Sequence, residues 1–208
     1  RLKGNWGTGF KAPSLYQLYS SYGSPSLKPD ESKSYDFGFE QRFFKDKLSF
    51  DLTRFHNDFR NMVDWDSATS KYKNIGRAET KGFEIGAKFL PVENFTIGTN
   101  FTYTDTQDKE TGLELQRRPK RQANFDVNWR FMAKANFNLG VTHVGSRKDT
   151  GYTTSKGYTK LNLAYLYDIA DNFQFFTRIE NLFDKKYQEV RGFAAEGRSF
   201  YAGARANF

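Results

Sequence analysis

One histidine and one carboxylate in this sequence are spaced so that they could act together on a substrate. His56 and Asp58 are two residues apart, and side chains two positions apart lie on the same face of a β-strand. Such a pair could activate a water molecule, as a protease would require. The second carboxylate or base that a mechanism would need is not evident. A polar contact is therefore the simpler interpretation, and we expect neither an enzyme nor any catalytic residue.

Two groups of carboxylates could hold a hard cation. Asp64 and Asp66 form one group, and Asp105, Asp108 and Glu110 form the other. Carboxylate oxygens are the ligands that Ca²⁺ prefers, but neither group has the ligand spacing of an EF-hand loop. The chain has no cysteine, which excludes disulfides and thiolate metal sites. We therefore predict no metal site and no cofactor.

The elements that carry these residues are predicted by apolar and polar residues that alternate with period two, which is typical of β-strands. In residues 122–131 every odd position from Ala123 to Phe131 is apolar and every even position is polar. The last residues, 200–208, alternate in the same way and end on Phe208. Ten segments of this kind predict an all-β fold, and they begin near the following residues: Leu2, Ser32, Leu48, Phe83, Phe95, Gln122, Phe137, Leu161, Phe173 and Phe200.

Composition alone would suggest a polar soluble protein, because hydrophobic residues make up 38% of the chain and the mean hydropathy is −0.77. A transmembrane β-barrel has the same averages, since only one face of each strand meets lipid. The aromatic content of 18% fits the aromatic girdles of such barrels. A soluble sandwich would need a second layer over its apolar face, and no obvious second layer is present. We therefore predict a transmembrane antiparallel β-barrel.

The predicted connections alternate between short and long. Short turns are predicted at 44–47, 90–94, 132–134 and 168–172, and long polar loops at 10–31, 61–72, 106–117, 147–157 and 182–197. Short turns on the periplasmic side and long loops outside are the arrangement of outer-membrane barrels. We therefore expect the C-terminus to be periplasmic and the chain to be one continuous meander without a domain boundary.

The net charge of +8 does not by itself identify a partner. Lysine and arginine are spread over the polar strand faces, turns and loops, and no RNA-binding signature is present, so we expect no nucleic acid to bind. Lipopolysaccharide at the outer leaflet or an anionic ligand fits the same charge.

Three segments in order carry a resemblance to a known family. Residues 9–15 (GFKAPSL) and 24–32 (SPSLKPDES) look like the paired "FRAP" and "NPNL" loop signature of TonB-dependent outer-membrane receptors. Residues 57–59 (NDF) and 81–84 (KGFE) are similar to the "ND" and "KGxE" elements of these barrels. Residues 180–187 (ENLFDKKY), followed by a final strand that ends in Phe, are similar to their C-terminal box.

The resemblance implies that residues 1–208 are the C-terminal part of a barrel of about 22 strands. It also implies that the plug domain and the TonB box are absent from this chain. Such receptors lie in the outer membrane and import scarce large ligands with energy relayed by the TonB protein. The C-terminal box would include Arg191, Gly192, Gly197, Arg198, Tyr201 and Phe208. A terminal aromatic strand of this kind also resembles the signal that directs barrel assembly.

Within the family, residues 115–122 and 144–152 are similar to the cobalamin branch, so cobalamin or a related corrinoid is the expected ligand. There the residues matching Arg117 and Tyr152 are cobalamin contacts, and weaker loop candidates are Tyr16, Tyr19, Tyr22 and Trp65. Ferric-siderophore receptors share the barrel motifs and are the nearest alternative. The haem branch has a histidine between its two loop motifs, and residues 10–31 contain none. A self-contained ten-stranded outer-membrane protease using His56 and Asp58 is the alternative from another class.

Overall fold

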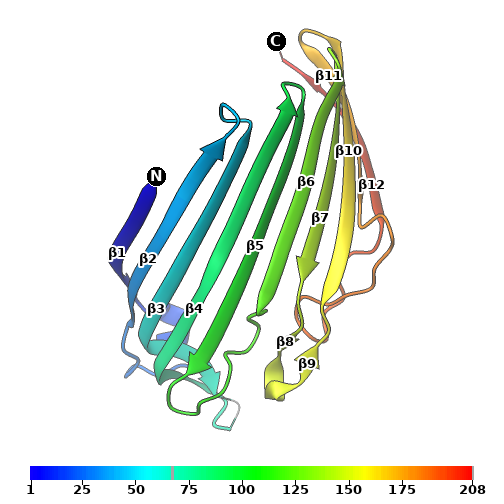
Figure 1. Ribbon diagram of the computed structural model, residues 1–208. Coiled ribbons are helices and arrows are strands. Elements are labelled where there is room, and N and C mark those ends of the chain that lie inside the picture. The colour runs from blue at the N-terminus through cyan, green and yellow to red at the C-terminus, as the bar shows by residue number, and fades with distance from the viewer. Residues whose placement is uncertain (67, 208) are drawn as a thin grey trace.

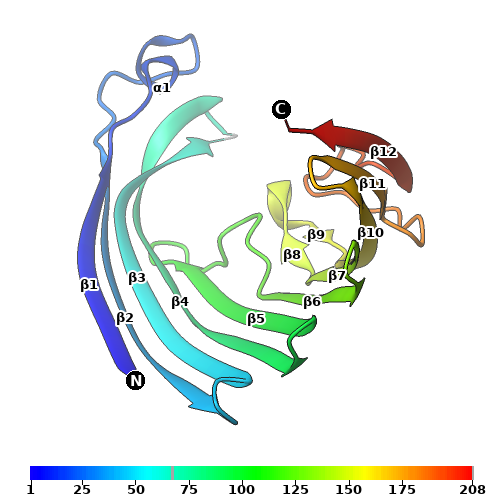
Figure 2. The ribbon, with the colours of Figure 1, turned by 90° about the horizontal axis from the view of Figure 1, so that it is seen from above.

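The computed structural model describes residues 1–66 and 68–207, and ten strands form one antiparallel sheet. Every strand pairs with its neighbours along the chain in the order β1-β2-β3-β4-β5-β6-β7-β10-β11-β12 (Figure 1). The strands are β1 (Leu2–Lys11), β2 (Asp30–Phe43), β3 (Leu48–Asp66), β4 (Lys71–Val92), β5 (Phe95–Asp108), β6 (Arg121–Met132), β7 (Ala135–Val144), β10 (Tyr158–Ala170), β11 (Phe173–Glu180) and β12 (Ser199–Ala206). The sheet curves into an open arc with β1 and β12 at its two edges (Figure 2).

The register of the strands gathers apolar residues on one face and polar residues on the other. Phe39, Leu52, Ile85 and Phe101 are consecutive register partners across β2 to β5 on the apolar face. The row beside it contains Gly38, Thr53, Glu84, Thr102 and Gln122. The alternation read from the sequence is thereby confirmed as two chemically different faces of one sheet.

The polar face is the hollow side of the arc. A groove of about 640 Å³ runs along β3 to β6, and its lining includes Asp51, Glu84, Asn100 and Asp126 from the polar rows. The apolar face carries large exposed side chains, such as Phe37 (62% exposed) and Trp129 (45% exposed), instead of a packed core. A lipid-facing surface explains this arrangement, because exposed aromatic side chains on one face are what a barrel presents to the membrane. No helix among the described residues is long and apolar enough to cross a membrane.

The short turns lie together at one end of the sheet, at the top of Figure 1, and the long connections lie at the other end. Two-residue links at 93–94, 133–134 and 171–172 and a four-residue link at 44–47 join consecutive strands, as predicted. In the last of these, Phe44, Lys45 and Asp46 have φ values of 53°, 55° and 67°, so three non-glycine residues in succession are left-handed.

The structure corrects the predicted loop at 61–72. β3 continues to Asp66 and β4 starts at Lys71, with Asp66 and Lys71 as register partners. Backbone pairing extends these strands past the point where apolar and polar side chains stop alternating. Similarly, β5 continues to Asp108 and so includes the first three residues of another predicted loop.

Two long connections contain short elements of their own. Residues 12–29 include α1 (Leu15–Tyr19), whose N-cap Ser14 accepts a hydrogen bond from the N–H of Gln17 while the Gln17 side chain accepts one from the N–H of Ser14. Residues 145–157, the β7–β10 connection, contain β8 (Arg147–Lys148), a 3₁₀ turn η1 (Thr150–Tyr152) and β9 (Thr154–Ser155). Phe208, expected to close the last strand, lies outside the described residues.

Candidate ligand site at the loop end

Three long loops meet at the carboxylate of Asp149, which is fully buried. Asp149 caps η1 by accepting a hydrogen bond from the N–H of Thr150 at 2.8 Å. It also accepts hydrogen bonds from the Ser155 hydroxyl (3.0 Å), the backbone N–H of Arg191 (3.0 Å) and Nε of Arg117 (3.1 Å). We call this set of five residues the junction. It connects the β5–β6 loop (109–120), the β7–β10 connection and the β11–β12 loop (181–198).

The junction keeps Asp149 ionised. The backbone N–H of Thr150 lowers the pKa of the Asp149 carboxyl most, and the donors on Arg191, Arg117 and Ser155 lower it further. Burial acts in the opposite direction but is outweighed, so the pKa lies well below the ordinary range of an aspartate. A charged carboxylate is therefore present at the centre of the loops at neutral pH.

A buried guanidinium fixes the β11–β12 loop at a second point. Arg147 is only 7% exposed, and its Nη2 donates to the carbonyl oxygens of Gln188 (2.8 Å) and Glu189. Arg147 is the register partner of Ser155 in the β8–β9 hairpin, which places it beside the junction. Its Nη1 is buried without a hydrogen-bond partner among the described residues. The positive charge of Arg147 is therefore only partly satisfied, by carbonyl dipoles.

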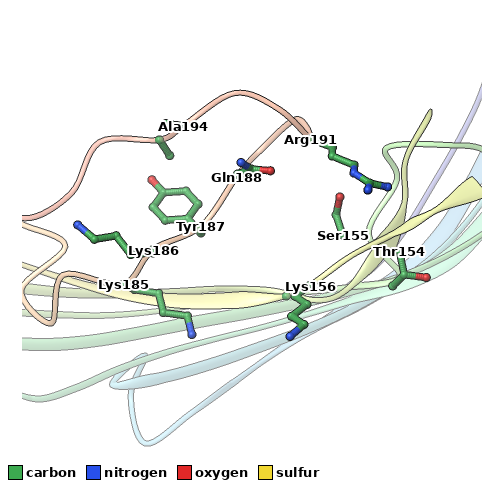
Figure 3. Close-up of a pocket in the computed structure, with 11 residues that line it drawn as sticks. Thr154, Ser155, Lys156, Lys185, Lys186, Tyr187, Gln188, Arg191 and Ala194 are labelled. Atoms are coloured by element: carbon green, nitrogen blue, oxygen red, sulfur yellow. The ribbon is translucent and has the colours of Figure 1, made fainter. Parts of the chain in front are cut away.

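Between β9 and the β11–β12 loop lies a cavity of about 570 Å³, which we call the basic cavity (Figure 3). Its lining contains four cationic side chains and no carboxylate among the described residues; the cations are Lys156, Lys185, Lys186 and Arg191. Of these, Lys186 is paired with Asp184 at 3.0 Å. The aromatic ring of Tyr187, another lining residue, packs against Tyr158 with centroids 4.1 Å apart.

A cavity lined in this way favours anionic groups. Lysine and arginine donate charge-assisted hydrogen bonds to carboxylate, phosphate or catecholate oxygens, and arginine can do so with two donors at once. Several cations around one concave surface also raise the local concentration of an anion.

A second group of side chains, the aromatic cluster, lies at the tips of β3 and β4. It consists of Tyr16, Tyr22, Trp65 and Tyr72. Trp65 contacts Tyr22 and Tyr72 edge to face, with centroid distances of 5.8 Å and 5.3 Å, and Tyr72 contacts Tyr16 at 6.2 Å. The backbone N–H of Tyr72 donates to the carbonyl of Tyr22 at 2.9 Å, which joins the α1 loop to the strand tips. Several rings of the cluster are more than 40% exposed, so flat apolar faces are open to a ligand.

The predicted ligand contacts fall into these two groups. Arg117 lies in the junction, and Tyr152 is the last residue of η1 beside it, 40% exposed. Both have left-handed backbones, with φ values of 58° and 55°. Tyr16, Tyr22 and Trp65 belong to the aromatic cluster, whereas Tyr19 is exposed without a ring partner among the described residues. Their roles in binding stay predictions.

The predicted C-terminal box shapes the β11–β12 loop and its return into β12. Gly192 has a φ of 89°, and a Cβ on Gly197 would lie 2.7 Å from Oδ1 of Asp184. That same oxygen accepts a hydrogen bond from the N–H of Arg198 at 2.9 Å. In β12 and its approach, the Tyr201 hydroxyl donates to Glu196 at 3.0 Å. The Arg178 guanidinium lies 4.2 Å from the centre of the Tyr201 ring.

The structure does not assemble the His56 and Asp58 pair. The His56 ring stacks on Tyr35 with centroids 4.8 Å apart, and Asp58 pairs with Arg77 at 3.2 Å. Among the described residues, no group of three His, Asp or Glu side chains could hold a metal ion.

Sequence reasoning missed Asp149 and the lysines of the basic cavity. The Asp149-Thr150-Gly151 segment has the composition of a turn that an aspartate caps, which was a usable signal for Asp149. Lys156, Lys185 and Lys186 lie in polar loops without periodicity, so only the fold brings them together.

A family model described as "TonB dependent receptor-like, beta-barrel" matches residues 1–182. Among solved structures, a ferric enterobactin receptor (PfeA) mutant from Pseudomonas aeruginosa is 22% identical with a TM-score of 0.84. The alignment covers all of this chain and 38% of that one. The copper transporter OprC is 17% identical with a TM-score of 0.82, and the alignment covers all of this chain and 37% of that one. The ferripyoverdine receptor of the Pseudomonas aeruginosa outer membrane is 20% identical with a TM-score of 0.76, and the alignment covers all of this chain and 31% of that one. The present chain thus spans about a third of the length of these structures, and similarity at this level of identity shows a shared fold.

Proposed function

Since this chain belongs to the TonB-dependent receptor β-barrel family, we propose that it forms part of a receptor that imports a large anionic ligand across the outer membrane. The ligand class that we favour is an iron-loaded siderophore. In this proposal the apolar face meets lipid and the polar face lines the lumen. The loop end faces outward, and the short turns and the C-terminus face the periplasm, where the TonB protein supplies energy through the rest of the receptor.

The basic cavity is the observation that carries the choice of ligand. Four cationic side chains line it, of which Lys186 is paired with Asp184, and the lining among the described residues contains no carboxylate. The buried Arg147 adds positive charge behind the wall. Ferric complexes of catecholate siderophores are anionic, so they would complement this surface by charge. Two of the similar structures are ferric enterobactin and ferripyoverdine receptors, which agrees with the proposal without establishing it.

The corrinoid hypothesis is the weaker of the two. It depends on Arg117 as a donor to the ligand, but Nε of Arg117 donates to Asp149 and one of its terminal nitrogens donates to Thr150 at 2.9 Å. Two donors of the guanidinium are therefore used within the protein. Tyr152 remains free to contact either class of ligand through its exposed ring.

The test compares two variants of the full-length receptor, and in each of them three cationic side chains are replaced by neutral glutamine. Lys156→Gln, Lys185→Gln and Arg191→Gln are combined in one variant, and a ferric catecholate complex and cyanocobalamin are the two probes. We expect the affinity for the ferric catecholate to fall roughly tenfold to hundredfold, because partly desolvated charged contacts are removed. The matched control, Lys45→Gln with Lys47→Gln and Lys134→Gln, removes three charges at the short-turn end.

Binding is measured by the quenching of intrinsic fluorescence at several salt concentrations. Unchanged affinity for the ferric catecholate in the cavity variant, or an equal loss in the control, would contradict the proposal. Tight binding of cyanocobalamin by the unmodified receptor, with none of the ferric complex, would restore the corrinoid assignment.

A further inference from the structure

We propose that Asp149 is a positioning residue that joins three loops into one unit, so that the walls of the basic cavity form and open together. Its effect on ligand binding depends on the proposed function, but its effect on the loops does not. Asp149 itself is buried and needs no contact with the ligand.

The first connection joins the β5–β6 loop to the β7–β10 connection. Nε of Arg117 donates to Oδ1 of Asp149 at 3.1 Å, and the backbone N–H of Arg117 donates to the carbonyl of Lys148 at 2.7 Å. One side-chain bond and one main-chain bond thus fix the same residue. Because Arg117 holds a left-handed backbone, its placement needs such external support.

The second connection joins the β11–β12 loop to the same carboxylate. The N–H of Arg191 donates to Oδ2 of Asp149 at 3.0 Å, across 42 residues of sequence. Two residues before Asp149, Arg147 donates to the carbonyl oxygens of Gln188 and Glu189. The β11–β12 loop is therefore held through one donor, the N–H of Arg191, and through two acceptors, the carbonyl oxygens that Arg147 contacts. If the loop opened, the carboxylate of Asp149 and the guanidinium of Arg147 would both lose these partners. Opening is costly because both groups lose their hydrogen-bond partners at once, and a charge that stays buried without a partner is strongly destabilising.

The geometry requires a carboxylate and not merely a polar side chain. Oδ1 accepts from Thr150 and Arg117, and Oδ2 accepts from Ser155 and Arg191. Both oxygens face two or more donors. An asparagine has nearly the same shape, but its amide nitrogen would present N–H groups to two of these donors. Asp149→Asn therefore keeps the volume and removes both the charge and half of the acceptor capacity.

The walls of the basic cavity come from the elements that Asp149 connects. Ser155 and Lys156 come from the β7–β10 connection, and Lys185 to Gln188 with Arg191 come from the β11–β12 loop (Figure 3). Ser155 and Arg191 line the cavity and also donate to Asp149. A change in the junction therefore moves cavity-lining residues directly.

Hydrogen–deuterium exchange on the full-length receptor, without ligand, tests the proposal. In Asp149→Asn we expect peptides covering 109–120, 145–157 and 181–198 to exchange about tenfold faster together, because charge-assisted hydrogen bonds are lost. Peptides from β6 and β7 should be unchanged, which a general loss of stability would not allow. Asp171→Asn, at an exposed turn on the opposite end, removes the same charge and should change none of the three loops.

Faster exchange in residues 145–157 alone would reduce Asp149 to a local cap and overturn the proposal. If Asp149→Asn yields no folded receptor, Arg117→Gln tests one connection of the junction by itself. With the Arg117 bond to Asp149 removed, 109–120 should exchange faster, while 181–198 stays protected because Arg191 and Arg147 still hold it. Unchanged exchange in 109–120 would then overturn the proposal. If the three loops open together but the ferric catecholate does not bind the unmodified receptor, the proposed ligand is wrong and the positioning role of Asp149 stands.

Discussion

The junction and the aromatic cluster lie at the same end of the sheet but are held together in different ways. In the junction, donors from three loops meet one buried carboxylate. In the aromatic cluster, exposed rings from α1, its loop and the strand tips contact one another edge to face, without a central group. The first arrangement concentrates the stabilisation in Asp149, and the second distributes it over several rings.

This difference predicts how each region responds when one of its side chains is removed. Hydrogen bonds to a buried charge are lost together when the charge is removed, whereas ring contacts are lost one at a time. The junction is therefore expected to behave as a unit, and the aromatic cluster to lose contacts gradually and adapt to ligands of different shape.

The largest effect is expected from Asp149→Ala, which removes the central group altogether. The guanidinium of Arg117, whose side chain is 49% exposed, and three other donors would lose their acceptor. Each buried donor left unpaired costs about 1–3 kcal/mol, so the combined cost should be about 3 kcal/mol or more. The free energy of opening of residues 181–198, measured by hydrogen exchange, should fall by this amount. A fall below about 0.5 kcal/mol would show that the other contacts hold the loop without Asp149.

A pair of glycine substitutions compares the two regions at matched sites. A Cβ on Gly157 would lie 2.7 Å from the carbonyl oxygen of Val144, and one on Gly23 would lie 2.7 Å from that of Gln17. Because backbone atoms cannot move aside, each change to alanine should cost about 1–3 kcal/mol locally. Gly157→Ala should accelerate hydrogen exchange in the junction loops, and Gly23→Ala only in residues 12–29. Spread of either effect to the other region would contradict their independence.

A smaller effect is expected from Trp65→Ala, which removes two ring contacts of the aromatic cluster. Each aromatic pair contributes about 0.5–1.5 kcal/mol beyond its buried area, so exchange at the tips of β3 and β4 should rise about tenfold. The three junction loops should not change. Phe43→Ala, at the other end of the sheet, removes an exposed ring of comparable character and serves as the control.

The smallest effect is expected from mild acid. The pKa of Asp149 is lowered in the folded protein, so its contribution to stability is present above the ordinary aspartate pKa and is lost as the pH falls through the lowered value. Between pH 7 and pH 5, exchange of the junction loops, corrected for intrinsic rates, should stay constant. A loss of protection that begins near pH 6 would mean that another titrating group controls these loops.

Much of the fold could be predicted from the sequence, because each strand meets two environments and its side chains alternate accordingly. The segment from Ala123 to Phe131 shows this most clearly. The extension of β3 to Asp66 could not be predicted, since backbone pairing continues there without alternation. Family resemblance correctly indicated the TonB-dependent receptor barrel, whereas the cobalamin branch rested on loop segments and is not supported by the similar structures.

The candidate site was only partly predictable, for a physical reason. Arg117 and Tyr152 were selected by resemblance, and the structure places both at the loop end. Asp149 gains its importance from Arg191, which lies 42 residues further along the chain. No local pattern encodes a contact of that range.

The meander order of the ten strands has a consequence for how the sheet is built. Each strand pairs with the one before it along the chain, with the short β8–β9 hairpin as the one interruption in numbering. Such an order lets each hairpin close locally and then serve as the template for the next strand, so no early step has to bring distant segments together. The turn at Phe44, Lys45 and Asp46 holds three non-glycine residues in left-handed conformations, which adds an energetic cost to closing the β2–β3 hairpin. The energetic cost of forming this hairpin is therefore set partly by its turn and not only by the pairing of its strands.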